Sequence, residues 1–359
     1  MKILLLSKYS RKGASSRLRS FQYIPYLEAH GFSVTIENLF DDQHLSEIYT
    51  KKKRSKRRSA KLYLTRLLKL FRSNKYDLIW IEKEIFPYLP AFAERFLFLL
   101  NKPYVVDYDD AIFHNYDLSS NPVIRKLLSN NIKTIMRLSS HVIAGNDYLG
   151  SYAESAGARN ITIIPSVVDH TRYKAKHDSR SSQPVIGWIG TPFTQKYIVG
   201  IKKALKTACD TFGARLMLVG ANPRIKEELS GFDIEVVPWT EEQEGALINR
   251  MDIGIMPLAD EPWERGKCGY KLIQYMACSV PVITSPVGVN VQIVQGSHSG
   301  LLASSIDEWE ASLAQLLASR EKRLQLGQAG RAAVENQYSM QIQAPRLAKI
   351  FDETIKGRT

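Results

Sequence analysis

Residues 267–290 combine a lysine, glycines and the predicted start of a helix. Gly266 and Gly269 flank Lys267, so the backbone there can approach a ligand without a Cβ in the way. The helix that follows points its first N–H groups and the positive end of its dipole at the same place. A cation and a helix N-terminus together suit an anion, most simply a diphosphate. An ordinary αβ unit whose glycines only form turns would show the same local pattern.

Two series of alternating strands and helices must position this segment. In residues 1–172, strands are predicted at 2–7, 32–37, 76–82, 104–107, 141–144 and 161–165, and helices at 16–30, 87–100 and 123–138. A linker is predicted at 172–183. Residues 184–340 then repeat the alternation, with strands at 184–189, 214–219, 234–237, 253–257 and 281–284. The tail is predicted to be helical and includes a final helix within 341–359. The pattern indicates an α/β protein with two doubly wound parallel sheets that bind ligands at the carboxyl ends of their strands.

The composition is that of a soluble globular protein, since 44% of the 359 residues are hydrophobic and 24% are charged. No apolar run approaches the length of a membrane span, and the run within the first ten residues is too short for a signal-peptide core. Cys209, Cys268 and Cys278 lack the spacing of metal ligands. They indicate reduced thiols in a cytosolic protein and no zinc site.

The net charge of +13 is concentrated in one stretch, because residues 51–75 contain twelve lysines and arginines and no acid. The stretch opens with Lys51, Lys52, Lys53, Arg54, Lys56, Arg57 and Arg58. In the helix predicted after it, Arg58, Lys61, Thr65, Lys69 and Arg72 share one face, and Leu64, Leu67, Leu68 and Phe71 lie largely opposite. A basic amphipathic helix with a polybasic lead is typical of an anchor on anionic lipid. A solvated basic face on a helix packed against the core is the alternative. Nucleic acid is not expected, because base-stacking aromatics are nearly absent.

Several segments together resemble the retaining glycosyltransferases of the GT-B fold, family-4 type, also called glycosyl transferases group 1. They are residues 267–290, the loop 188–196, the strand 252–258 and the exit from the first half at 161–169. The resemblance implies two Rossmann-like domains facing a cleft, with a C-terminal helix packing back toward the N-terminal domain. It also implies that the second domain binds a nucleotide sugar and that the acceptor comes from the first. No metal or other cofactor is expected, because basic side chains and helix dipoles neutralise the leaving diphosphate.

The resemblance assigns the donor diphosphate to Gly190, Thr191, Lys196, Lys267, Cys268 and Gly269. Thr191 stands where the family usually has an arginine, and Lys267 is expected to compensate. The family's pair of glutamates falls on Gly266 and Gln274. Gln274 can still hydrogen-bond a ribose diol, but without the charge of a carboxylate. Glu264 could supply a nearby acid, and Trp239 could stack on the base or simply pack in the core.

Asp109 and Asp110 align with the family's His-Asp pair and are the catalytic candidates. A carboxylate assists both a deprotonating hydroxyl and a carbon that develops positive charge. A solvated turn that caps the next helix is the structural alternative. The acceptor or phosphate side is assigned to Ser15, Ser16, Arg17 and His114, although Ser15 or Ser16 could instead be the N-cap of the first helix.

We therefore expect a cytoplasmic enzyme on the inner face of the membrane. It would move a sugar from a UDP- or GDP-type donor to a polysaccharide, oligosaccharide or glycolipid acceptor, with retention of anomeric configuration. Three alternatives stay open. Asp107 and Asp109 match the acid-x-acid pattern that holds a metal in GT-A transferases, a GT-B-shaped epimerase would need no acceptor, and an inactive membrane-recruited scaffold would bind no donor.

Overall fold

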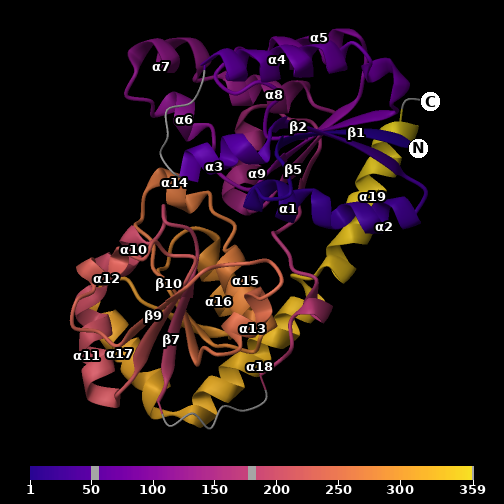
Figure 1. The fold of residues 1–359 in the computed structure, drawn as a ribbon. Coiled ribbons are helices and arrows are strands. Elements are labelled where there is room, and N and C mark those ends of the chain that lie inside the picture. The colour runs from indigo at the N-terminus through magenta and orange to yellow at the C-terminus, as the bar shows by residue number, and fades with distance from the viewer. Residues whose placement is uncertain (50–55, 177–182, 358–359) are drawn as a thin grey trace. The chain divides into compact units, whose positions relative to one another are not determined.

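Parallel strands form two six-stranded sheets in the computed structural model, which describes residues 1–49, 56–176 and 183–357 (Figure 1). The N-terminal unit comprises Met1–Ser166, Gly266–Cys268 and Gln343–Thr359, and the C-terminal unit comprises Val167–Arg265 and Gly269–Ile342. Helices cover both faces of each sheet. The predicted α/β class with two doubly wound parallel sheets is therefore confirmed. Lys51, Lys52, Lys53 and Arg54 lie outside the described residues, as do residues 177–182 of the predicted linker.

The N-terminal sheet has the strand order β2-β1-β3-β4-β5-β6. Its strands are β1 (Lys2–Tyr9), β2 (Ser33–Phe40), β3 (Leu78–Glu82), β4 (Tyr104–Tyr108), β5 (His141–Ala144) and β6 (Ile161–Ile163). The central strands β3 and β4 are buried along their whole length, as apolar runs in a covered parallel sheet are. The chain reverses its direction of travel across the sheet between β1 and β3, so a ligand site is expected at their carboxyl ends.

The helices of this unit include α1 (Ala14–Arg19), α2 (Ile24–Ala29), α3 (Asp42–Tyr49), α4 (Lys56–Leu70), α5 (Phe92–Leu99), α6 (His114–Asp117), α7 (Pro122–Leu128), α8 (Asn131–Leu138) and α9 (Asp147–Ser155). The single helix predicted at 16–30 is wrong. It is broken into α1, a 3-10 turn (Phe21–Tyr23) and α2, because Ser20 leaves the helical region and Pro25 stands in the first turn of α2. The helix predicted at 123–138 is likewise two helices.

The C-terminal sheet has the order β12-β11-β10-β7-β8-β9. Its strands are β7 (Val185–Ile189), β8 (Arg215–Val219), β9 (Ile234–Val237), β10 (Ile253–Met256), β11 (Val282–Thr284) and the unpredicted β12 (Gly300–Leu302). The helices are α10 (Lys196–Gly200), α11 (Lys202–Phe212), α12 (Ile225–Glu228), α13 (Glu244–Ile248), α14 (Pro262–Arg265), α15 (Tyr270–Ala277), α16 (Val289–Ser297), α17 (Ile306–Ala318) and α18 (Arg320–Asn336). Here the switch point lies between β7 and β10.

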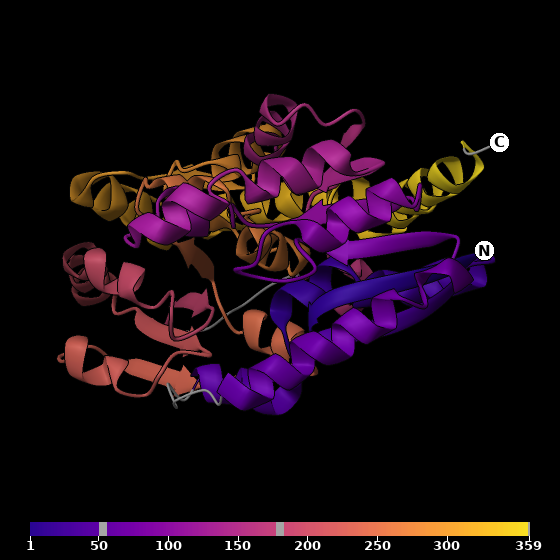
Figure 2. The ribbon, with the colours of Figure 1, turned by 90° about the horizontal axis from the view of Figure 1, so that it is seen from above.

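The C-terminal helix α19 (Met340–Lys356) returns to the N-terminal unit from Gln343 onward. In Figures 1 and 2 it lies alongside the N-terminal sheet. The ring of Phe351 is fully buried, with its centroid 5.0 Å from that of Trp80 on β3 and 6.3 Å from that of Phe32. The expected return of the last helix is thus confirmed. Within the described part of the chain, no helix is both long enough and apolar enough to cross a membrane.

Candidate active site

A network of buried acids and bases lies where β3 and β4 end in the N-terminal unit. Lys83 follows β3 in a left-handed backbone conformation, with φ of 67°. Its ammonium nitrogen is 2.8 Å from Oδ1 of Asp109 and 3.5 Å from Oδ2 of Asp110. The side chain of Lys83 is 6% exposed, that of Asp109 13% and that of Asp110 30%. Asp110 is therefore the member of the trio that solvent, or a substrate, reaches most easily.

The three charges set one another's protonation. Burial acts to lower the pKa of Lys83, but the two aspartates outweigh it and the pKa is raised. Burial acts to raise the pKa of Asp109, but Lys83, Arg19 and a hydrogen bond from Ser15 lower it overall. Burial and the charge of Asp109 raise the pKa of Asp110 against the opposing effect of Lys83 and Lys267. Asp109 is thus the firmly ionised carboxylate, and Asp110 is the more basic one, the property needed to accept a proton.

A second layer of ion pairs supports this trio. Arg19 of α1 donates from Nε to Oδ1 of Asp107 at 2.8 Å and from Nη1 to the carbonyl of Ile164 at 2.8 Å. Burial raises the pKa of Asp107 to about 6 although Arg19 opposes the shift. The hydroxyl of Ser16 donates to Glu82 at 2.6 Å, and Ser16 accepts a hydrogen bond from the backbone N–H of Tyr9. These contacts tie α1 to the ends of β1, β3 and β4.

Residues Gly266–Cys268 pack into the same network. Asn146 donates from Nδ2 to the carbonyls of Gly266 and Lys267, each at 3.0 Å, and the thiol of Cys268 donates to the carbonyl of Asp109 at 3.1 Å. Nζ of Lys267 then lies 3.9 Å from Oδ1 of Asp110. A Cβ on Gly266 would lie 2.4 Å from Cβ of Ala111, so no side chain fits at this position.

The residues predicted on the acceptor or phosphate side separate into two groups. Ser15 donates to Oδ2 of Asp109 at 2.7 Å, and so, like Ser16, it belongs to the network. The alternative of a serine N-cap is wrong, because α1 is preceded by Gly13 and has no side-chain cap. Arg17 is buried and donates to the carbonyl of Arg11. His114 is held between Asp117 and the hydroxyl of Tyr148, each at 2.9 Å, which is the geometry of a structural histidine.

The predicted phosphate loop follows β7 in the C-terminal unit. The N–H of Gly190 donates to the carbonyl of Val219, and a Cβ on Gly190 would lie 2.9 Å from Nζ of Lys271 and closer still to Trp188. Lys271, in the first turn of α15, lies over the Trp188 ring at 4.6 Å and donates to the hydroxyl of Thr194 at 3.3 Å. Thr191 is half-buried in the loop. Lys196 begins α10 and is exposed, with its ammonium 4.9 Å from the ring centre of Tyr197.

Glu264 supplies a buried carboxylate in the same unit. It lies in α14 at 5% exposure and accepts a hydrogen bond from the hydroxyl of Tyr197 through Oε1, while its buried Oε2 has no hydrogen-bond partner. Burial and the bond to Glu264 raise the pKa of Tyr197, so the phenol stays the donor. Gln274 is buried within α15. Trp239 donates from Nε1 to Glu244 at 2.7 Å and packs beside the hydrophobic core.

The residues around the start of α15 are also closely packed. Gly269 is its N-cap with φ of 63°, and a Cβ there would lie 2.5 Å from Ile293. Asn290, at the start of α16, donates to the hydroxyl of Thr284 at 2.9 Å, and its buried Oδ1 has no hydrogen-bond partner. The glycine is thus required both by conformation and by packing, and α15 begins beside the loop that carries Gly190.

Residues 183–319 match the family model of glycosyl transferases group 1. The C-terminal unit is a group 1 glycosyl transferase domain. No sequence among curated proteins matches the chain.

Solved glycosyltransferase structures share the whole fold. HepE from Anabaena in complex with UDP-glucose superposes with a TM-score of 0.74 at 16% identity, over 98% of this chain and 100% of HepE. Sucrose-phosphate synthase from Thermosynechococcus elongatus gives 0.72 at 16% identity, over 99% and 100% of the two chains. A glycosyltransferase from Rickettsia africae gives 0.72 at 14% identity, over 99% and 98%. The fold is therefore GT-B.

Sequence reasoning missed three cations of these two clusters: Lys83, Lys271 and Arg19. Lys83 directly follows a predicted strand, and that position was a signal, because ligand-facing residues follow strands in such sheets. Lys271 lies two residues beyond Gly269, within the segment first singled out. Arg19 gave no signal, since it lies inside a stretch predicted as one continuous helix.

The acid-x-acid motif does not have the surroundings of a metal site. Asp107 is paired with Arg19, and Asp109 with Lys83. Both carboxylates already face a cation, so a divalent ion would be repelled or would have to displace it. Within the residues that the structure describes, no group of three histidine, cysteine or acidic side chains is arranged to hold a metal.

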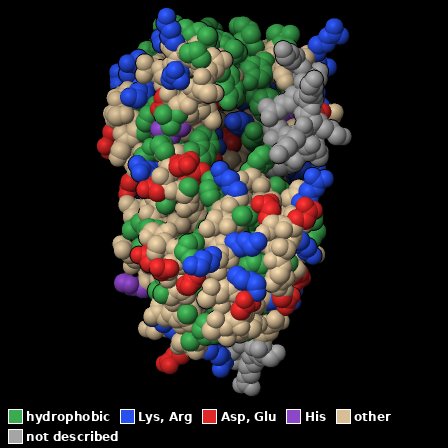
Figure 3. Space-filling model, turned by 90° about the vertical axis from the view of Figure 1, so that its left-hand side faces the viewer, with side chains coloured by type: hydrophobic (Ala, Val, Ile, Leu, Met, Phe, Trp, Pro, Cys, Tyr) green, Lys and Arg blue, Asp and Glu red, His purple; other side chains and the backbone are tan. Residues whose placement is uncertain are grey.

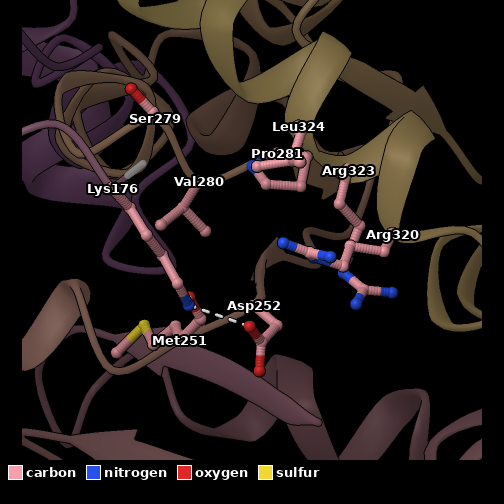
Figure 4. A pocket seen from close by; sticks show the side chains of 9 residues that line it. All are labelled: Lys176, Met251, Asp252, Ser279, Val280, Pro281, Arg320, Arg323 and Leu324. Carbon is pink, nitrogen blue, oxygen red and sulfur yellow. Dashed lines mark hydrogen bonds and ion pairs between the residues drawn. The ribbon is translucent and has the colours of Figure 1, made fainter. Parts of the chain in front are cut away.

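A pocket of the C-terminal unit lies away from these loops, where β10 and β11 begin (Figure 4). Lys176 spans it, donating to Asp252 and to the carbonyl of Met251, each at 2.8 Å, and Asp252 accepts the N–H of Val185. Arg323, from α18, donates to the carbonyls that end α17. The charged groups of this pocket therefore form hydrogen bonds and ion pairs between strands and helices. They lie at the edge of the sheet opposite to the one where such folds bind ligands.

Proposed function

We propose that this protein is a glycosyltransferase that moves a sugar from a nucleoside diphosphate sugar to a hydroxyl acceptor, with retention of anomeric configuration. The observation that carries the proposal is the position of Lys271. Its ammonium lies beside Gly190 and Thr194 at the carboxyl end of β7, within the region that matches the family model. A cation beside a glycine loop is what a leaving diphosphate requires.

The donor diphosphate is bound by the loop after β7 and the start of α15. At Gly190 and Thr191 the backbone of the loop can approach the diphosphate closely. Lys271 and Lys196 supply positive charge. Gly269 lets the N-terminus of α15 begin without a side chain in the way. Negative charge grows on the diphosphate as the glycosidic bond breaks, and fixed cations stabilise that charge without reorganising.

The donor's nucleoside is held by a carboxylate. Glu264 is buried, and its Oε2 lacks a hydrogen-bond partner, so it can accept from the ribose hydroxyls in the role that Gln274 was expected to fill. Uracil is the proposed base, because HepE was solved with UDP, with UDP and glucose, and with UDP-glucose. Trp239 is already engaged by Glu244, so in this proposal it supports the loop.

The N-terminal unit supplies the carboxylates. Asp110 is the more exposed and the more basic of the pair, and it is assigned to the acceptor hydroxyl. Asp109 stays ionised and fixes Lys83. Lys267, beside Asp110, adds positive charge next to this carboxylate.

The acceptor is proposed to be a glycan or a lipid-linked sugar, used at the inner face of the membrane. The polybasic stretch 51–58 supports that location by its charge. Reaction without a metal is proposed because cations already face the carboxylates and the phosphate loop.

The test is donor hydrolysis measured over UDP-, GDP- and ADP-sugars, with and without a chelator, followed by the anomeric configuration of the product by NMR. The proposal expects nucleoside diphosphate release from one donor class, undiminished by chelator and abolished in Asp110→Asn. An isomerised nucleotide sugar without diphosphate release would instead identify an epimerase. No calorimetric binding to any of these donors would identify a scaffold.

A further inference from the structure

Helix α4 turns an apolar side to solvent. Leu64 and Leu68, one turn apart, are 57% and 58% exposed, and Phe71 just beyond the helix is 65% exposed. In a helix packed on a core these positions would be buried. Figure 3 shows hydrophobic side chains gathered at one end of the face in view, with lysines and arginines beside them.

The basic residues of α4 explain why the helix lies this way. Arg66 is buried and donates to the carbonyls of Ser7 and Glu37, each at 2.6 Å. Arg58 forms ion pairs with Asp41 and Glu47, and Lys69 pairs with Glu37. Of the predicted basic face, Arg58 and Lys69 therefore pair with acids, whereas Lys61, Thr65 and Arg72 are exposed. The alternative of an apolar side packed against the core is wrong, because Leu64, Leu68 and Phe71 are exposed.

The chain before α5 and α5 itself extend the exposed apolar surface. Tyr63 of α4 donates to the carbonyl of Pro87, and the rings of Phe71 and Phe96 meet edge to face at 6.4 Å. Exposure is 41% for Phe96 and 76% for Leu99. We name as the α4–α5 face the exposed side chains of Leu64, Leu68, Phe71, Tyr88, Phe96 and Leu99.

The charged residues at the border of this face are cations. α4 has no acidic residue, and the one acid of α5, Glu94, is 2% exposed and accepts the N–H of Ile85. The exposed charged residues of α4, α5 and the turn after α4 are Arg57, Lys61, Arg72, Lys75 and Arg95. An apolar centre with a cationic border complements a surface whose outer layer carries anionic groups and whose inner layer is apolar, as in a bilayer of anionic lipids.

We propose that the α4–α5 face docks on an anionic lipid bilayer. Leu68, Phe71 and Leu99 enter the boundary between headgroups and acyl chains, and Lys61, Arg72 and Arg95 meet lipid phosphates. A second copy of the chain is a poorer occupant, because a two-fold contact would bring the same cations together. Docking is independent of sugar transfer, but it deepens the proposed function by placing the carboxylate-bearing unit at a membrane that holds lipid-linked acceptors.

The experiment measures co-sedimentation of the full chain with vesicles of phosphatidylcholine, with and without about half phosphatidylglycerol, in the absence of any sugar nucleotide. We expect binding only to the anionic vesicles, weakened as salt rises. The triple variant Leu68→Gln, Phe71→Gln, Leu99→Gln should bind at least tenfold more weakly. Ile342→Gln on α19, 41% exposed, is the matched control and should bind as the unaltered protein does. Circular dichroism checks that each variant folds.

Two further variants distinguish insertion of this face from attraction by charge alone. Phe71→Trp should become quenchable by brominated lipids, which a purely electrostatic contact would not produce. Neutralising Lys51, Lys52, Lys53 and Arg54 tests the polybasic stretch by itself. Unchanged vesicle binding of the triple variant would overturn the proposal. The proposal would also be overturned if the unaltered chain bound no vesicles but self-associated in ultracentrifugation, and the triple variant did not self-associate. Donor hydrolysis is assayed separately, so failure of docking and failure of the transferase proposal remain distinguishable.

Discussion

The ammonium of Lys83 lies 2.8 Å from Oδ1 of Asp109, and both side chains are nearly removed from solvent. Lys83 also adopts a left-handed backbone conformation at the end of β3, which costs free energy in a residue with a Cβ. The strained backbone aims the cation at two adjacent carboxylates. Without the ammonium of Lys83, the negative charges of Asp109 and Asp110 would lie next to each other with no cation between them.

Lys83→Met should therefore destabilise the fold and disturb both aspartates. Removing one partner of a buried ion pair typically costs about 3 kcal/mol, because the other charge stays buried. Urea unfolding measures the loss, and Lys75→Met, at an exposed lysine of the same unit, is the control. A variant as stable as the control would show that Asp109 is solvated well enough without Lys83.

Glu94 should give the protein a pH-dependent stability. Its pKa is raised from 4.5 to about 7, chiefly by burial. At intermediate pH the folded protein holds a proton that the unfolded chain releases. The stability from this proton is complete below pH 4.5 and is lost as pH rises toward 7, a change of roughly 3 kcal/mol.

Glu94→Gln isolates this effect, because the amide keeps an oxygen that can accept the N–H of Ile85. The difference in unfolding free energy between Glu94→Gln and the unaltered protein should increase between pH 4.5 and 7 in favour of the variant. Asp107, whose pKa is raised to about 6, adds a similar slope to both proteins and cancels in the difference. A difference that does not vary with pH would mean that Glu94 titrates normally.

Gly266→Ala should destabilise the N-terminal unit and shift Lys267. The added Cβ would lie 2.4 Å from Cβ and 2.8 Å from the backbone nitrogen of Ala111. Overpacking of this kind costs about 1 to 3 kcal/mol. Gly296→Ala is the matched control, since nothing lies within 4 Å of its Cβ and it sits in helix α16. Equal unfolding free energies for the two variants would show that residues 266–268 shift to accommodate the added Cβ without loss of stability.

Most of the fold could be predicted from the sequence because the strands are short apolar runs between turn residues. β5 and β9 were predicted with the bounds that the structure shows. β12 was not, because three half-buried residues at a sheet edge, one of them glycine, carry little periodicity. The break of helix 16–30 at Ser20 had one local signal, Pro25. The contacts of Ser16 with Glu82 and of Arg19 with Asp107 connect residues that are far apart in the sequence, so they could not be predicted.

The site was less predictable, because its parts are far apart in the chain. In the sequence, Gly266 stood out only because the family has a glutamate at this position. Its close packing on Ala111 explains why a residue without a side chain is needed there. Lys267 was singled out beside its glycines, whereas in the structure Lys271 packs on Trp188 and reaches the loop after β7. Local spacing could not distinguish the two lysines, since their partners lie about 80 and 160 residues away in sequence.

Lys271→Met should weaken donor binding and turnover together. The methionine can keep the packing on Trp188 while it removes the charge beside Thr194. Loss of one preorganised charge contact typically lowers turnover by about a hundredfold. UDP binding by calorimetry and donor hydrolysis are the measurements, with Lys226→Met, at an exposed lysine of α12, as the control. Turnover equal to the control would remove Lys271 from the diphosphate site.

Glu264→Gln should weaken the binding of a nucleoside diphosphate more than it affects folding. The amide keeps an oxygen for the hydroxyl of Tyr197 but replaces the charged acceptor, so a hydrogen bond to ribose loses its charge assistance. We expect KM for the donor to rise about tenfold with little change in kcat, since the ribose contact is the same in ground and transition states. The 2′-deoxy donor provides the comparison, because it should lose affinity for the unaltered protein and much less for the variant. A variant with unchanged KM, or one that discriminates against the deoxy donor as strongly as the unaltered protein does, would assign Glu264 to fixing Tyr197 alone.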